Sequence, residues 1–252
     1  MTIDFSRRAL GKAPARFDAR TYRLGAVLAE RLIDIPPACN WLPQASWPMW
    51  NNDRIGCCTQ VSVASAIRSW TSAAQSTVML SDAQVLGNYS AQSGYRSDVP
   101  ASDQGAVELD VLNRWRQEGY DRPGQTRDYL TGFGSVEPHE RGNVRRAIAA
   151  LGGLYIGVQI PQYIMQTNGD WVLQTNADRT IAGGHAIWLH GYDQDWLYFN
   201  SWGQSLRMTW DWFETYCDEA YGLVSRQNWL GIKGRSPQCE DVNALLAELR
   251  AS

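Results

Sequence analysis

Two segments far apart in the chain carry side chains that could together perform nucleophilic catalysis. The first, Asn51–Thr59 (NNDRIGCCT), places two cysteines directly before an apolar run. The second, Gly183–Gly203 (GGHAIWLHGYDQDWLYFNSWG), supplies a histidine and an asparagine. A thiol attacks a carbonyl carbon as its thiolate, and an ordinary cysteine has a pKa of about 8.5. A helix N-terminus and a nearby histidine both favour the thiolate, so the sequence predicts that Cys58, His185 and Asn200 meet in space.

The local context of each side chain suits its expected role. Cys58 begins a run with helical periodicity, and Gly56 just before it allows a tight turn. His185 follows two glycines at the start of an expected strand, where a side chain can reach across a cleft. His190 is five residues further on and would face the opposite side of a regular strand. Asn200 lies on the paired strand, and its amide is expected to orient the imidazole.

The elements that would position these residues appear in a simple order, with helices first and strands later. Helical patterns cover Tyr22–Leu32, Cys58–Ala74, a stretch capped by Ser81, Gly105–Gly119 and a stretch capped by Asn143 that stops at Gly152. Strand patterns cover Leu154–Ile160 (half-buried), His185–Tyr192, Trp196–Trp202 and the region Gly222–Lys233, with Asp193–Asp195 as a hairpin turn. This order favours an α+β fold with segregated halves.

The domain organisation that we expect is an N-terminal arm followed by one catalytic domain. Residues 1–34 form the arm, and residues 35–252 form the domain. Within the domain, a helical lobe covers about 50–150, a β lobe covers about 151–234, and a helix with a small apolar face covers about 240–251. For the arm we favour a packing strap on the surface over the alternative, an inhibitory segment.

Composition excludes several classes of protein. The chain has 252 residues, 44% of them hydrophobic, and a net charge of −3, which gives no reason to expect nucleic acid or an anionic membrane as partner. No apolar run approaches the roughly 20 residues of a membrane span, and the N-terminus lacks a secretory signal. Five irregularly spaced cysteines favour a reducing compartment. With three histidines and no CxxC or HExxH motif, we expect no metal and no cofactor.

The order Cys…His…Asn and the sequence NSWG at Asn200–Gly203 resemble the papain-like cysteine peptidases. His185 lies 127 residues and Asn200 lies 142 residues after Cys58, near the roughly 130–150 of that family. The resemblance extends to PACNW before the active-site loop, to LSDAQ at the Ser81 helix and to the helix-to-strand passage at 144–160, so that it covers 36–233. It implies a papain-like α+β fold with the cleft between the two lobes.

The same resemblance implies roles for individual residues. Cys58 would be the nucleophile, His185 the general base and then the acid, and Asn200 the residue that orients His185. Trp202 would shield the His185–Asn200 hydrogen bond from water. The backbone N–H of Cys58 would be one oxyanion donor, and Asn52, six residues before it, would replace the family's glutamine as the second.

The segment around the cysteines departs from the family pattern at several positions. Asn52 is one methylene shorter than glutamine, and Thr59 stands where the family has an aromatic residue. Ile55 replaces a cysteine that usually forms a disulfide, in keeping with a reducing compartment. The adjacent Cys57 also leaves the choice of nucleophile open, although the spacing to Asn52 favours Cys58.

These features predict a thiol protease that hydrolyses peptide or isopeptide bonds of a peptide or protein substrate through a thioester. The short GCCT motif favours a bacterial or phage-encoded member, cytoplasmic or associated with a virion. Three alternatives remain open. They are a cell-wall amidase or endopeptidase, a transglutaminase-type acyl transferase, and a catalytically inactive papain-like structural or binding protein.

Overall fold

The fold is seen in a computed structural model that describes residues 8–30, 35–42, 46–228 and 241–251. The helices are α1 (Leu24–Glu30), α2 (Cys58–Ala73), α3 (Asp82–Ser93), the 3-10 turn η1 (Pro100–Ser102), α4 (Glu108–Gln117), α5 (Arg141–Leu151), α6 (Gln162–Met165), α7 (Trp210–Tyr216) and α8 (Val242–Ala251). The strands are β1 (Cys39–Asn40), β2 (Tyr120–Arg122), β3 (Gln125–Asp128), β4 (Gly132–Ser135), β5 (Leu154–Pro161), β6 (Ile181–Tyr192), β7 (Trp196–Ser201), β8 (Gln204–Thr209) and β9 (Cys217–Val224). No helix within these ranges is long and apolar enough to cross a membrane.

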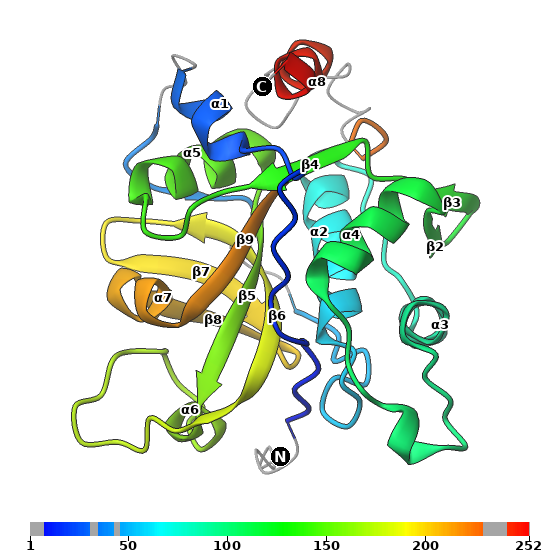
Figure 1. The fold of residues 1–252 in the computed structure, drawn as a ribbon, viewed down its shortest axis with the longest axis vertical. Helices are drawn as coiled ribbons and strands as arrows, with labels where there is room; N and C mark the ends of the chain where they lie inside the picture. Colours follow the sequence, from blue (N-terminus) through cyan, green and yellow to red (C-terminus); the bar gives the residue numbers. More distant parts are fainter. Residues whose placement is uncertain (1–7, 31–34, 43–45, 229–240, 252) are drawn as a thin grey trace.

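The strands form one large antiparallel sheet and a small hairpin. The order in the large sheet is β4-β9-β5-β6-β7-β8, with β1 paired to β6, while β2 and β3 pair with each other. Helices α2, α3 and α4 lie to one side of the sheet and α7 lies to the other (Figure 1). This arrangement is an α+β fold with a helical lobe and a β lobe, as the sequence predicts.

Helix α2 is the central element of the helical lobe, and its polar residues are buried along with its apolar ones. It packs on β6 and also contacts α3 and α4. For this reason Thr59, Ser62 and Ser65, which the periodicity assigns to an outward face, are each at most 2% exposed. The helix that carries the candidate nucleophile is therefore fixed on several sides.

The elements next to the site agree only in part with the sequence prediction. The cap of α3 is confirmed, because Ser81 and Gln84 form a capping box. Helix α5 begins at Arg141 and not at a cap on Asn143, which lies inside the helix. Strand β5 is buried on both faces, not one, because it lies between β6 and β9 in the sheet with α2 and α7 against it.

The last part of the sheet also differs from expectation. The late strand is β9, which begins at Cys217 and ends at Val224, whereas the region predicted extends to Lys233. Residues 229–240 are outside the described ranges. Strand β8 and helix α7 carry no pattern that predicts them.

The N-terminal arm runs between the sheet and the helices before it reaches α1 (Figure 1). Its backbone forms hydrogen bonds with the sheet and with the helical lobe. The N–H of Lys12 donates to the carbonyl of Gly184 on β6 at 3.1 Å. On the helical side, the N–H of Ala106 donates to the carbonyl of Gly11 at 2.9 Å. Residues 8–13 thus fill the space between the lobes and do not lie on the outer surface.

Candidate active site

Cys58 is the first residue of α2 and is completely buried. Its sulfur accepts hydrogen bonds from the backbone N–H groups of Ala186, Gly11 and Thr59. These donors favour the thiolate, but burial outweighs them and raises the pKa of Cys58 to about 11. With the arm in place, Cys58 is therefore a protonated thiol at neutral pH, lying beside the residue that follows His185.

The neighbouring thiol of Cys57 faces the protein core. Its sulfur lies 3.5 Å from the carbonyl oxygen of Trp50, to which the thiol donates. Burial raises the pKa of Cys57, and the nearby Cys58 adds to the rise. Of the two adjacent cysteines, Cys58 is the one whose sulfur bonds to the β6 backbone.

His185 projects from β6 next to Ala186. Its Nε2 lies 2.7 Å from the hydroxyl oxygen of Ser201, and its ring stacks on Trp202 at 4.4 Å with the planes 16° apart. The other ring nitrogen, Nδ1, is buried and has no hydrogen-bond partner among the described residues. If Nε2 carries the proton and donates to Ser201, Nδ1 is left as a free base.

The electrostatic surroundings keep the imidazole neutral. Burial lowers the pKa of His185 to about 3, and the positive charge of Arg8 contributes. The Arg8 guanidinium lies 4.5 Å from the centre of the Trp202 ring, which separates it from the imidazole stacked on that ring. The arm therefore supplies one of the two causes that prevent a thiolate–imidazolium pair.

Asn200 does not bond to His185 in the described structure. Its Nδ2 donates to the hydroxyl of Ser65 on α2 at 2.8 Å. Its Oδ1 is buried with no partner among the described residues. The expected orienting residue thus faces α2, and Ser201 takes the place next to the imidazole.

A bulge between β6 and β7 explains this exchange. At the turn end of the hairpin, Gly191 pairs with Tyr198, but beyond the bulge Trp188 pairs with Asn200. Without the bulge, Asn200 would lie opposite Leu189 and share a face with His185. The shift of one residue moves every following side chain to the other face. Spacing along the chain does not reveal such a shift.

Asn52 and Trp202, two further predicted site residues, lie at the site and both make contacts with the arm that the sequence does not predict. Asn52 is 1% exposed, and its Nδ2 donates to the carbonyl of Ile55 within its own turn, at 3.1 Å. Its carbonyl accepts from the N–H of Ala9 in the arm at 3.2 Å. Trp202 covers the imidazole, and its Nε1 reaches the carbonyl of Ala9 at 3.4 Å.

Sequence reasoning missed the residues that the arm brings to the site. Arg8 and Lys12 belong to no motif, and Ser201 lies inside the NSWG signature without a role assigned to it. The signature could have pointed to Ser201. Adjacent residues of a strand face opposite sides, so if Asn200 does not face His185, Ser201 does. In the described ranges, no group of three or more His, Cys, Asp or Glu side chains could hold a metal ion.

Comparisons with known proteins are informative at the level of structure. No family model matches the sequence, and no curated protein does. Among solved structures, xylellain, a cysteine protease from Xylella fastidiosa, superposes with a TM-score of 0.66 at 17% identity, over 86% of this chain and 96% of its own. A cysteine protease of Carica candamarcensis gives 0.54 at 16% identity, over 75% and 98%. Digestive procathepsin L 3 of Tenebrio molitor gives 0.57 at 15% identity, over 87% and 76%. Similarity at these identities shows that the chain has the papain-like fold.

Proposed function

We propose that this protein is a cysteine peptidase that hydrolyses peptide or isopeptide bonds with Cys58 and His185. One observation supports this most directly. The buried sulfur of Cys58, at the start of α2, bonds to the N–H of Ala186, the residue next to His185. This contact supports a nucleophile from α2 that works with a base from β6.

The proposed reaction is acyl transfer in two halves. His185 takes the thiol proton through Nδ1, and the thiolate of Cys58 attacks the amide carbon. The N–H groups near the sulfur, with the Asn52 amide as the proposed second donor, stabilise the oxyanion. His185 then gives the proton to the departing amine, and a thioester remains. Water activated by His185 hydrolyses the thioester and restores the thiol.

For the third member of the site, the geometry supports Ser201 in place of Asn200. Its hydroxyl is the group bonded to Nε2 of His185, and Trp202 covers the ring beside it. A hydroxyl that accepts from Nε2–H fixes the tautomer that leaves Nδ1 unprotonated. Asn200 would act indirectly, by tying β7 to Ser65 on α2.

We further propose that the arm keeps the enzyme latent. Gly11 donates to the sulfur of Cys58, so the arm occupies the position of a substrate backbone. Burial raises the pKa of Cys58, and burial with Arg8 lowers the pKa of His185. Displacing the arm would admit water to both groups and remove Arg8. This favours the inhibitory segment over the surface strap.

Activity-based labelling tests the proposed function. A peptidyl chloromethyl ketone should alkylate Cys58 in a variant whose arm is weakened, such as Gly11→Ala, and site mapping by mass spectrometry should find the adduct there. Adding His185→Ala should abolish the labelling, and Cys57→Ser should leave it intact. Labelling at Cys57, or none at Cys58, would favour the inactive binding protein. Cleavage of peptidoglycan but not of peptides would favour the cell-wall amidase.

A further inference from the structure

Lys12 of the arm is held in a pocket lined by Gly157, Asp218 and Glu219, here called the Lys12 pocket, and the negative charge of the nearby Glu108 adds to it. We propose that this pocket selects a lysine or arginine side chain in the substrate, at the residue preceding the one whose carbonyl Cys58 attacks. The inference rests on the proposed function and adds the substrate class to it. In the latent chain, Lys12 occupies the place of that basic residue.

The ammonium group of Lys12 makes two ion pairs in this pocket. Its Nζ lies 2.9 Å from Asp218 and 2.9 Å from Glu219. The Lys12 side chain is fully buried, whereas the Asp218 side chain is 24% exposed. Burial alone would lower the pKa of Lys12, but the negative charges of Glu108, Glu219 and Asp218 outweigh it and raise that pKa. A buried cation is therefore stabilised by groups that belong to the two lobes and not to the arm.

A third carboxyl group, that of Glu108, lies near the Lys12 pocket. Glu108, at the start of α4, is completely buried, and neither of its oxygens has a hydrogen-bond partner among the described residues. Burial, with Glu219 nearby, raises the pKa of Glu108 well above its usual value. An unpaired buried carboxyl group is costly unless a cation or donor reaches it. The carboxyl oxygens of Glu108 could therefore accept hydrogen bonds that the ammonium group of Lys12 does not supply.

The pocket is also shaped for a long unbranched stem. A Cβ atom at Gly157 on β5 would lie 1.9 Å from Cε of Lys12 and 2.8 Å from Oδ1 of Asp218. Any side chain at this position would therefore block the stem. Gly157 pairs with Glu219 across β5 and β9, so the open position lies directly beside one of the carboxylates.

The position of the pocket relative to Cys58 assigns it to one half of the substrate. His185 must protonate the leaving amine, so the leaving half lies on the side of His185 and Trp202. Arg8 and Ala9 of the arm contact Trp202 on that side. Lys12 lies on the other side of Gly11, whose N–H reaches the sulfur. The Lys12 pocket therefore serves the acyl half, and the arm runs in the direction opposite to a substrate.

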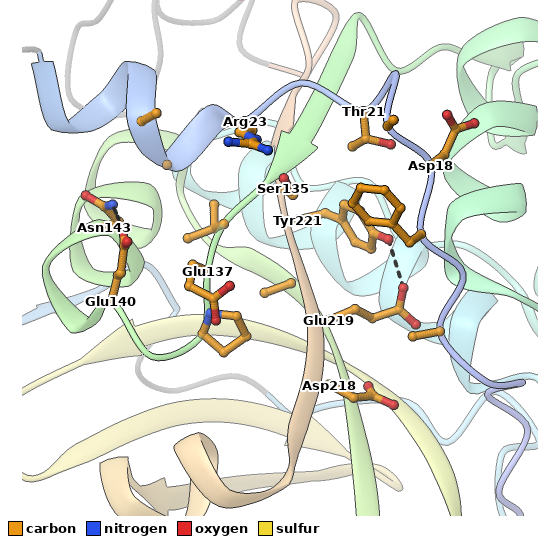
Figure 2. A pocket seen from close by; sticks show the side chains of 18 of the residues that line it. Asp18, Thr21, Arg23, Ser135, Glu137, Glu140, Asn143, Asp218, Glu219 and Tyr221 are labelled. Carbon is orange, nitrogen blue, oxygen red and sulfur yellow. Dashed lines mark hydrogen bonds between the residues drawn. The ribbon is translucent and has the colours of Figure 1, made fainter.

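Space next to the carboxylates can accommodate a larger head group. Asp218 and Glu219 also line a cavity of about 860 Å³ between the arm and β9. Figure 2 shows both side chains on the β9 wall of this cavity, with Glu219 bonded to Tyr221. The bond from the Tyr221 hydroxyl, at 2.8 Å, fixes one oxygen of Glu219 and leaves the other for the cation. We expect a guanidinium to be accepted as well as an ammonium.

The cleavage test uses the full chain with Gly11→Ala, which displaces the arm and leaves the pocket unchanged. Fluorogenic amides ending in Lys-Gly should be cleaved on the order of tenfold or more faster than those ending in norleucine-Gly, since norleucine keeps the stem and loses the charge. Adding Glu219→Gln together with Asp218→Asn should bring the ratio close to one. Glu118→Gln, which changes an exposed carboxyl group, should leave the ratio unchanged. Adding Gly157→Ala should reduce cleavage of both amides, and Gly87→Ala, on an open helix face, should reduce neither.

A binding test separates this inference from the proposed function. In the variant Gly11→Ala with Cys58→Ala, fluorescence anisotropy should show tighter binding of a labelled Lys-Gly peptide than of its norleucine-Gly counterpart. Cleavage with equal rates and equal binding of the two peptides would overturn the inference and leave the peptidase proposal standing. Lysine-dependent binding without cleavage in the Cys58-containing variant would support the pocket and overturn the peptidase proposal. Equal binding without cleavage would overturn both.

Discussion

The imidazole of His185 bonds to Ser201, while the adjacent Asn200 bonds to Ser65 on the other face of β7. A one-residue shift in the pairing of β6 and β7 causes this difference. The NSWG signature thus remains at the site, but the structure exchanges which of its residues touches the histidine. The roles of the two residues can be separated by experiment.

We expect Ser201→Ala, in a Gly11→Ala background, to lower kcat/KM about 10- to 100-fold, because a hydrogen bond to a charged imidazolium contributes roughly 1.5–3 kcal/mol. Asn200→Ala should mainly lower the melting temperature, because it leaves Ser65 unsatisfied. Peptide hydrolysis and thermal unfolding of both variants measure the two effects. A larger loss of kcat in Asn200→Ala than in Ser201→Ala would show that Asn200 orients His185 in the active state.

Weakening the arm should activate the enzyme. In Gly11→Ala the new Cβ would lie 1.8 Å from the carbonyl oxygen of Gly56, so the arm cannot keep its place. We expect labelling of Cys58 by a chloromethyl ketone to accelerate on the order of tenfold or more, which corresponds to a loss of about 1.4 kcal/mol in arm docking. Gly87→Ala, where nothing lies within 4 Å of the new atom, is the matched control. Equal labelling rates in the two variants would contradict an inhibitory arm.

The pH dependence of Cys58 alkylation should change when the arm is displaced. In the latent chain, burial raises the pKa of Cys58 to about 11, so iodoacetamide should react appreciably only at alkaline pH. In Gly11→Ala, water and a protonated His185 favour the thiolate, and the midpoint should fall by more than about one pH unit. Cys58→Ser gives the background from the other thiols. A midpoint that stays in place would refute the electrostatic account of latency.

Stability should fall as the pH is lowered through the ordinary pKa of histidine. Burial lowers the pKa of His185 to about 3 and that of His190 to about 4. Between these values and about 6.5, the unfolded chain binds protons that the folded chain does not. Each histidine then removes up to about 1.4 kcal/mol of stability per pH unit on acidification.

The variant His190→Gln should therefore show a smaller loss of unfolding free energy from pH 6.5 to 5 than the unmodified chain does. His190 bonds through Nδ1 to Asn40 at 3.0 Å and stacks on Trp47, so the variant should also be less stable at pH 7. His139→Gln, at an exposed position, should keep the original slope. Urea unfolding at several pH values measures all three, and identical slopes in every variant would refute the prediction.

The sequence by itself determined the fold class, and it predicted the two reacting groups proposed here, His185 and, by its spacing from Asn52, Cys58. The helical periodicity after Cys58 and the two strand patterns around His185 and Asn200 are local, and local patterns are set by side chains a few residues apart. The capping box of Ser81 is local for the same reason. These parts could be read without any knowledge of how distant segments pair.

Only the tertiary structure decided the contacts that depend on register and on segments far apart in the chain. A single bulge in β6–β7 decided between Ser201 and Asn200 as the partner of His185, because one residue of shift inverts the faces of a strand. The sequence could not predict the surroundings of Lys12 either, because the carboxyl groups near it come from α4 and β9, far along the chain. Glu108, Asp218 and Glu219 form no sequence motif. They meet only because the arm, the helical lobe and the sheet close around one buried cation.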